Sequence, residues 1–342
     1  MKGWLRIGLA GILLIAGCAG KGGEARPSLT SVVLLIQGVE GDRGPFDFAA
    51  AGVAAFQRSE GVRVPLLALG EDPIAWERMI REAVREPDRR LFIIGMEGPA
   101  RLGLEQARIF PGKRFVLLGL EDPGEIPANV LVLSWDAWEA GWLAGYIAGH
   151  LVGQEGSDRR SGRRIGALAG PGASVALEGY RCGAWAAGVR SDGILLEEIA
   201  TTSDPVAGFK AALRLYERGA EILSGLAGGS SAGLFEAAAA TRRYAIGFGE
   251  DWGARYEAMR SPAFEALLGS VTPAIDEAVR RILRQSRRGE LPFGMRWTLK
   301  LEEGGFVWRG TPAFFRIAPS WLQRQIRERA VHPHPCPQGF GG

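Results

Sequence analysis

Short apolar runs alternate with amphipathic segments along most of the chain. The runs are rich in β-branched residues and leucine and lack strict alternation, which is typical of parallel strands covered on both faces. Five of them predict strands at 32–36, 62–69, 91–94, 115–118 and 130–133. Helical patterns between them predict helices at 47–60, 73–85 and 99–109. The order predicts a parallel α/β sheet.

A second set of the same kind begins after Arg163. Its expected strands lie at 165–169, 194–200, 222–224 and 244–248. Two consecutive sets, each about the size of a domain, indicate two lobes. Four further elements are expected beyond them: a strand at 263–271, a helix at 272–283 capped by Thr272 and Pro273, a hairpin at 295–310 turning at Gly304 and Gly305, and a helix at 320–329.

The segment 134–151 carries glycines every fourth residue, at Gly141, Gly145 and Gly149. In a helix of 20 apolar residues this spacing would indicate a membrane dimerisation face. The segment is shorter, however, and polar groups interrupt it at Asp136, Glu139 and His150. We therefore expect a buried helix packed closely on a sheet.

The first seventeen residues have the features of an export signal. Lys2 and Arg6 precede an apolar stretch, and small residues stand directly before Cys18. The pattern resembles the bacterial lipobox, which implies cleavage before Cys18 and acylation of that residue. An ordinary signal peptide with a chance cysteine is the alternative. Residues 1–17 are then a signal peptide and 18–30 a tether, and we expect a protein exported and lipid-anchored to the cell membrane.

Charge and chemistry exclude several classes of function. Removing Lys2 and Arg6 from 41 basic residues leaves 39 against 38 acidic ones, so nothing suggests a nucleic-acid partner. The three histidines form no catalytic or zinc-binding set with other residues, so we expect no enzyme, no metal and no cofactor. Cys182 and Cys336 are so differently placed that no disulfide framework is expected.

Several motifs, in order, resemble those of the basic membrane protein family. They are WEAGWLAGYIAGHL, RIGALAGPGASVALEGYRCGAWAAGV, SDPVAGFKAA, IGFGEDW and GSVTPAIDEAV. The resemblance covers about 32–308. That family comprises lipid-anchored substrate-binding components of ABC transporters, including purine nucleoside receptors. It implies the type I periplasmic-binding fold, in which two Rossmann-like lobes with parallel sheets are joined by three crossings and hold ligand between them.

The resemblance also implies domain boundaries. Crossings are expected near 134–136, 249–252 and 291–293. The first lobe would then comprise 31–134 plus 253–290, the second 135–252 plus 291–330, and 331–342 would be a flexible tail.

The opening turn of the first lobe, DRGPFDF, is the first part of the expected ligand site. It keeps the acids Asp42 and Asp47 of the family's turn, and Phe46 is placed to stack on a base. The AGGSSAG turn presents backbone N–H groups to a ligand or is only a tight connection. The full set of expected ligand residues is Asp42, Phe46, Asp47, Trp135, Gly228, Gly229, Ser230, Glu250, Asp251 and Trp252. For the tryptophans, Trp138 included, interlobe packing is the alternative.

Three positions depart from the family pattern. Gly119 and Gly249 stand where the family has aspartates, and Pro273 stands where it has a lysine. Each lost partner in a buried polar site costs about 1–3 kcal/mol. Two hypotheses follow. The protein captures a small, nucleoside-like solute and delivers it to an ABC permease, or it is a divergent lipoprotein that acts as a sensor or interaction protein. A hydrolase is a weaker third reading. We expect a monomer whose other contact is the lipid bilayer, through Cys18.

Overall fold

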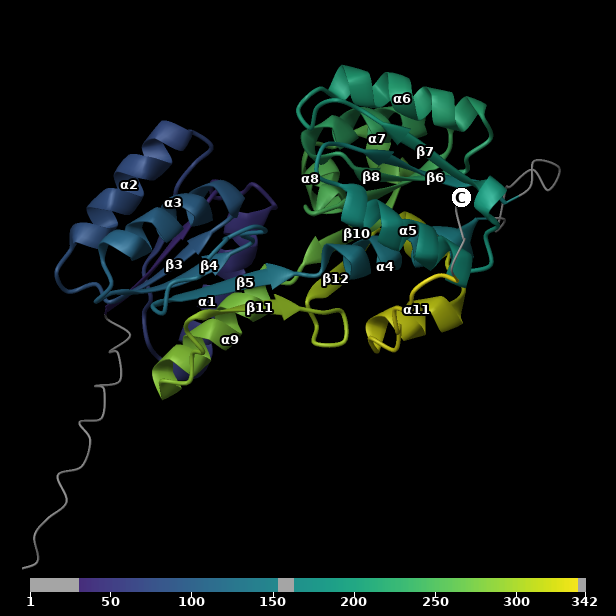
Figure 1. Cartoon of the computed structure of the whole chain (residues 1–342). Helices are drawn as coiled ribbons and strands as arrows, with labels where there is room; N and C mark the ends of the chain where they lie inside the picture. The colour runs from purple at the N-terminus through teal and green to yellow at the C-terminus, as the bar shows by residue number, and fades with distance from the viewer. Residues whose placement is uncertain (1–30, 153–162, 338–342) are drawn as a thin grey trace, which may run out of the picture.

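A computed structural model describes residues 31–152 and 163–337. The predicted signal peptide, the tether and Cys18 lie outside the described residues. The described chain forms two lobes, each built on a six-stranded sheet with helices on both faces (Figure 1). This confirms the predicted α/β fold with two lobes. Among the described residues, no helix has the length and apolarity needed to cross a bilayer.

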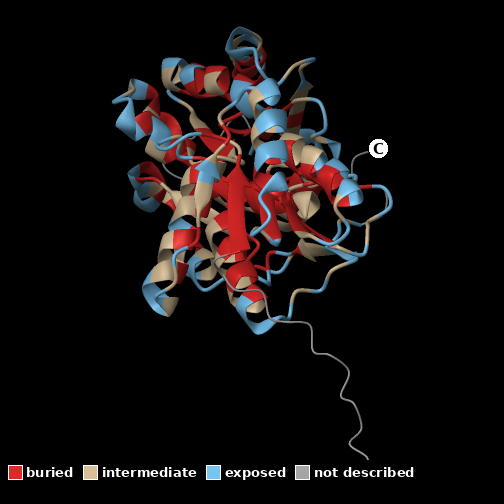
Figure 2. Cartoon of the chain, turned by 90° about the vertical axis from the view of Figure 1, so that its left-hand side faces the viewer, coloured by how far each residue is buried: buried red, intermediate tan, exposed pale blue. Residues whose placement is uncertain are grey.

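The sheet of the first lobe is entirely parallel, in the order β11-β5-β4-β3-β1-β2. Its strands are β1 (Val32–Ile36), β2 (Leu66–Ala68), β3 (Leu91–Gly95), β4 (Arg114–Leu118), β5 (Val130–Trp135) and β11 (Met295–Leu299). Alternate side chains of β1 point to opposite faces. Leu34 packs with α1 (Pro45–Glu60) and α9 (Ile275–Arg288), whereas Leu35 packs with α2 (Pro73–Arg85) and α3 (Glu97–Ile109). Burial on both faces explains the continuous apolar runs, and Figure 2 shows buried strands between helices whose outer faces are exposed.

The second lobe has the order β12-β10-β9-β8-β6-β7, and only β12 runs antiparallel to its neighbour. Its strands are β6 (Ile165–Ala169), β7 (Ile194–Glu198), β8 (Ile222–Leu226), β9 (Tyr244–Phe248), β10 (Leu267–Pro273) and β12 (Phe306–Gly310). One face packs against α4 (Ala137–Leu151), α5 (Ser174–Ala186), α10 (Pro312–Ile317) and α11 (Ser320–Arg327). The other packs against α6 (Pro205–Glu217), α7 (Ser231–Thr241) and α8 (Trp252–Ala258).

The chain passes between the lobes at three places: after β5, after β10, and between β11 and β12. Backbone hydrogen bonds join these crossings to one another. Asp136 N donates to Leu299 O at 3.1 Å, and Ala274 N donates to Gly305 O at 2.8 Å. The three segments therefore form one joint at the centre of the molecule (Figure 1).

Two of the expected crossings lie elsewhere in the structure. The first is where it was predicted, but β10 pairs with β9 and β12, so 253–273 remain in the second lobe. Strand β11 pairs with β5, which places 295–299 in the first lobe. The predicted hairpin at 295–310 is therefore wrong, because its two strands extend different sheets. The predicted helix start at Thr272 is also wrong, since Thr272 is buried in β10 and α9 begins at Ile275.

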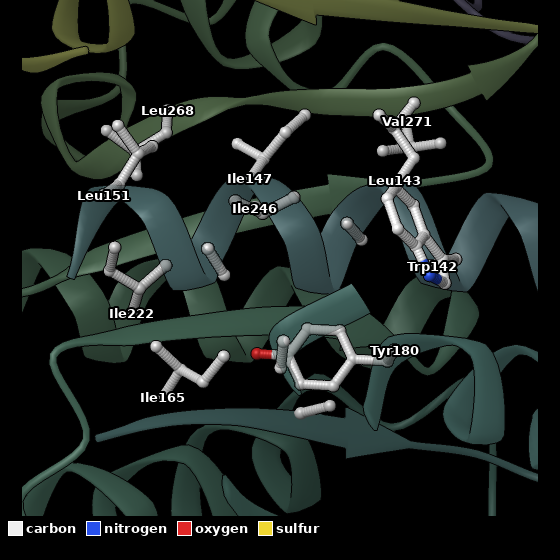
Figure 3. Packing of buried hydrophobic residues seen from close by; sticks show 14 of the residues in the cluster. Trp142, Leu143, Ile147, Leu151, Ile165, Tyr180, Ile222, Ile246, Leu268 and Val271 are labelled. Carbon is white, nitrogen blue, oxygen red and sulfur yellow. The ribbon is translucent and has the colours of Figure 1, made fainter. Parts of the chain in front are cut away.

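Helix α4 is buried, as predicted, but its glycines face another helix as well as lying above a sheet. A Cβ at Gly141 would lie 1.8 Å from Ala176 O, and one at Gly145 would lie 2.0 Å from Tyr180 O. Reciprocally, a Cβ at Gly179 of α5 would lie 1.9 Å from Trp138 O. Leu143 and Ile147 fill the other side of α4 against the sheet, and the Tyr180 hydroxyl donates to Gly166 O at 2.7 Å (Figure 3).

The end of the chain is fastened to the second lobe. Cys182 and Cys336 form a disulfide with Cα atoms 4.9 Å apart, and Trp142 Nε1 donates to His334 O at 3.1 Å. Val331 is buried. The expectation of a loose end is therefore wrong for 331–337, and the two thiols are paired. The partners are 154 residues apart, and no local pattern indicated their contact.

Substitution of Gly145 by alanine tests the close approach of α4 to α5. In an open helix this change stabilises by roughly 0.5–1 kcal/mol. Here the added methyl group overlaps Tyr180 O, so we expect the free energy of unfolding to fall by about 1–3 kcal/mol or more. Urea unfolding measures it. Gly112→Ala is the matched control, because no atom lies within 4 Å of a Cβ there. Equal stability of Gly145→Ala and the wild type would contradict this packing.

Candidate functional site

The carboxyl ends of the parallel strands in the two lobes approach each other. The turn after β1 meets the turn after β9, where Asp251 N donates across the lobes to Arg43 O at 3.3 Å. In parallel α/β sheets, ligands bind beyond the carboxyl ends of the strands. The residues at these ends therefore make up the candidate site.

Asp42 and Asp47 shape the turn at the start of α1. Gly44 N donates to Asp42 Oδ1 at 2.7 Å, while Gly41 N and Arg43 N donate to the two oxygens of Asp47, each at 2.9 Å. The second oxygen of Asp42 lies over Gly38, where a Cβ would approach it to 2.0 Å. Both predicted ligand acids thus stabilise the turn by accepting hydrogen bonds from its backbone N–H groups. A direct contact of either acid with ligand stays a prediction.

Phe46 lies largely in the first-lobe core and is 9% exposed. The aromatic ring of this helix that meets the other lobe is Phe48. The Arg309 guanidinium lies over it, with Cζ 4.3 Å from the ring centroid. The predicted stacking role of Phe46 is untested, and Phe48 is the residue that the turn pattern missed.

Arg309 supplies a cation at the junction. It extends from β12 of the second lobe, its Nε donates to Thr272 Oγ1 at 3.0 Å, and it lies 4.0 Å from Asp251 Oδ2. Asp251 Oδ1 meanwhile caps α8 by accepting from Ala254 N at 3.0 Å. Pro273 carries no charge where a lysine was expected from the resemblance, but Arg309 places a guanidinium beside the same strand end.

An apolar wall stands at the ends of β3, β4 and β5. Gly119 adopts φ +72°, and a Cβ there would lie 3.0 Å from Met96 Cε and 3.8 Å from Trp135 Cζ3. Met96 therefore fills the space that an aspartate side chain would enter. The indole Nε1–H of Trp135 is buried and has no hydrogen-bond acceptor among the described residues. A buried donor of this kind costs about 1–3 kcal/mol unless an acceptor reaches it.

Glu250 is an acidic group of the second lobe whose pKa is shifted at the junction. Burial raises the pKa of its carboxyl above the ordinary value, and the charges of Asp42 and Glu71 from the first lobe raise it further. Arg255, at 3.0 Å from Glu250 Oε2, acts in the opposite direction. Glu71 accepts a hydrogen bond from Gln37 Nε2 at 2.8 Å. Carboxylates from both lobes thus face each other here.

Several residues that were predicted to contact ligand or to lie at the cleft make packing contacts or hydrogen bonds inside the second lobe. Trp252 is 3% exposed and packs on Phe235, and its Nε1 donates to Phe248 O at 3.3 Å. Ser230 is buried, and its hydroxyl donates to Thr201 O at 3.0 Å. Trp138 packs against the second-lobe core.

Gly228 and Gly229 are exposed at the end of β8, and Gly228 has φ +52° beside Thr202. Their position is the predicted one, and their contact with ligand stays a prediction. Met96 could have been found from the sequence, since it lies two residues beyond the predicted strand at 91–94. Arg309 could not, because the hairpin prediction placed β12 beside the wrong strand.

This architecture defines a protein of the type I periplasmic-binding class. It is similar to a solute-binding protein of an ABC transporter system from Aeropyrum pernix K1, with TM-score 0.63, 21% identity, and 90% of this chain and 82% of that chain covered. A solute-binding protein from Conexibacter woesei DSM 14684 gives TM-score 0.63, 21% identity, and coverage of 90% and 99%. A structure from Bacillus halodurans, described as a transcriptional activator of the comK gene, gives TM-score 0.66, 18% identity, and coverage of 89% and 99%. These likenesses show the fold.

The family model described as ABC transporter substrate-binding protein PnrA-like (Bmp) matches residues 29–309. The chain belongs to this family, which confirms the resemblance drawn from its motifs. No curated protein matches the chain. The family description and the first two similar structures name solute-binding components of ABC transporters, which supports a solute-binding role for this chain.

The raised pKa of Glu250 predicts how stability depends on pH. Because the folded protein binds this proton more tightly than the unfolded chain, its contribution is complete below the ordinary pKa of 4.5 and is lost as pH rises through the folded-state pKa. Glu250→Gln should therefore flatten the fall in unfolding free energy immediately above pH 4.5. Urea unfolding at a series of pH values measures this slope. Glu105→Gln, an exposed change on α3, should leave it unaltered, and an unaltered slope in Glu250→Gln would refute the assignment.

Proposed function

We propose that the protein is an exported, lipid-anchored receptor that captures a nucleoside-like solute between its lobes and delivers it to an ABC permease. The observation that carries the choice of ligand is the buried, unpaired indole N–H of Trp135 at the junction. None of the described residues accepts a hydrogen bond from this N–H, so an acceptor atom on the ligand would satisfy it. Membership in the substrate-binding family supports the role of capture and delivery.

The surroundings of Trp135 favour a flat ligand with acceptors at its edge. Met96, Gly119 and Trp135 form an apolar wall, to which a planar base presents its face. Ring nitrogens and carbonyl oxygens of a base accept hydrogen bonds. Arg309 offers further donors from the second lobe. With Gly119 and Gly249 lacking carboxylates, we infer that recognition is centred on the base more than on the ribose hydroxyls.

Export and anchoring rest on the N-terminal pattern and on the disulfide. Cys18 lies outside the described residues, so its acylation is proposed from the sequence. The pairing of Cys182 with Cys336 supports export, because disulfides persist in oxidising compartments and are rare in the cytosol.

Binding of nucleosides is the direct test. Calorimetric titration of the mature protein with adenosine, inosine, guanosine and uridine should give saturable binding, and the matching free bases should bind better than ribose. Trp135→Phe removes the donor but keeps an aromatic ring, so the dissociation constant should rise about tenfold. Trp321→Phe, an exposed change on α11, is the control and should bind as the wild type does. Failure of every nucleoside to bind would exclude this ligand class.

A second candidate is a sensor that binds a ligand without delivering it to a permease. The glycines at 119 and 249 and Pro273 favour it, because they remove polar groups that the family pattern supplies. The similar protein from Bacillus halodurans is described as a transcriptional activator. Uptake of labelled nucleoside by cells with and without the gene separates the two, since a sensor leaves uptake unchanged.

Acylation at Cys18 predicts the behaviour of the protein in cells. Metabolic labelling with palmitate should mark the wild type, which should enter the detergent phase on Triton X-114 partition. Cys18→Ser should be unlabelled and remain in the aqueous phase. Cys182→Ser combined with Cys336→Ser is a suitable control, because it removes both cysteines of the folded domain together with their disulfide and keeps the lipobox. Equal partition of the wild type and Cys18→Ser would refute the anchor.

A further inference from the structure

A cavity of about 280 Å³ lies in the second lobe, on the sheet face that packs against α10 and α11. Its walls come from β12, α10, α11 and the segment that links β11 to β12. Leu301, Phe306, Val307, Trp308 and Phe314 form most of the apolar lining. The volume is just below the roughly 300–1,000 Å³ that small-molecule sites usually have.

Two arginine side chains place positive charge in the lining of the cavity. Arg327 at the end of α11 and Arg329, two residues further on, are both exposed and line the cavity, and no acidic residue is among the lining residues. Gly304 allows Arg329 to lie against the linking segment, because a Cβ at that position would overlap the guanidinium. The nearby Glu303 accepts a hydrogen bond from Lys300 N at 3.1 Å within the same turn. The charged side chains that line the cavity itself are therefore both cations, while the exposed acids Glu302, Glu303 and Glu328 stand next to them in the chain without lining it.

Trp308 lines the cavity, and its indole nitrogen lies beside Gly310, where a Cβ would approach it to 2.9 Å. Its indole Nε1–H is buried and has no acceptor among the described residues. An occupant that carries an oxygen acceptor satisfies such a donor, whereas a purely apolar one leaves it unpaired at a cost of about 1–3 kcal/mol. Apolar walls, a free donor and two cations together describe an organic anion with an apolar body.

We propose that this cavity is a second ligand site, separate from the junction of the lobes, for a small amphiphilic carboxylate. The apolar chain lies against Phe306, Val307 and Phe314, and the carboxylate faces Arg327 and Arg329. The guanidinium groups favour a carboxylate because its geometry matches their paired donors. The site does not depend on which solute the junction binds.

Octanoate is the probe for this site. Indole N–H resonances of the ¹⁵N-labelled protein are followed during titration, and the Trp308 signal is assigned by its loss in Trp308→Phe. Octanoate should shift the Trp308 signal saturably and leave the Trp135 signal in place. Octanol and octylamine have the same chain without the negative charge and should bind at least tenfold more weakly.

Charge-removing variants complete the test. Arg327→Gln combined with Arg329→Asn should weaken octanoate binding at least tenfold; asparagine suits position 329 because its φ is +54°. Arg324→Gln on the same helix does not touch the cavity lining and should bind as the wild type does. Val307→Phe, which fills the cavity, should also abolish binding, with an unchanged circular dichroism spectrum as the check on folding. No saturable shift, equal binding of octylamine, or full binding by the double variant would overturn the proposal.

Discussion

The joint between the lobes is the constraint on which the rest of the structure depends. Backbone hydrogen bonds join the three crossing segments: Asp136 N donates to Leu299 O, and Ala274 N donates to Gly305 O. The Glu139 carboxylate also accepts a hydrogen bond from Leu301 N, and burial raises the pKa of that carboxyl. Because these bonds hold the sheets with their carboxyl ends facing each other, a single joint decides which residues of each lobe meet a ligand.

Closure about such a joint requires that each lobe move as a rigid body. The packing of α4 on α5 supplies this in the second lobe, since glycines on both helices bring backbone against backbone. The disulfide between Cys182 and Cys336 then fastens the end of the chain to α5. Both features lie on the face away from α6 and α7, so they stiffen the lobe without entering the junction.

Local patterns located most of the strands of this fold but did not show which strands pair, and they misplaced the boundary between β10 and α9. The strands at 32–36, 165–169 and 244–248 were predicted to the residue, because burial on both faces leaves an uninterrupted apolar run. The pairing of β11 and β12 was not predicted. A glycine turn between two apolar runs is the pattern of a hairpin. Here, however, β11 and β12 do not pair with each other, and each is hydrogen-bonded at the edge of a different sheet. The candidate site divides in the same way: Asp42, Asp47 and Trp135 follow from strand ends, whereas Phe48 and Arg309 meet only through the tertiary fold.

The departures from the family pattern acquire a physical meaning in this structure. Gly119 does not leave an empty space, since Met96 Cε occupies it and extends the apolar surface of Trp135. The charge absent at Pro273 reappears as Arg309, which is held by Thr272 and lies against an aromatic ring of the opposite lobe. Gly249 has no such replacement, because no atom lies within 4 Å of the place of its missing Cβ. The first lobe is thus apolar at Gly119, whereas the second lobe lacks an acid at Gly249 and carries its cation on Arg309. The proposed base-centred recognition rests on this distribution, because a planar base would place its apolar face against Met96 and Trp135 and its acceptors within reach of Arg309.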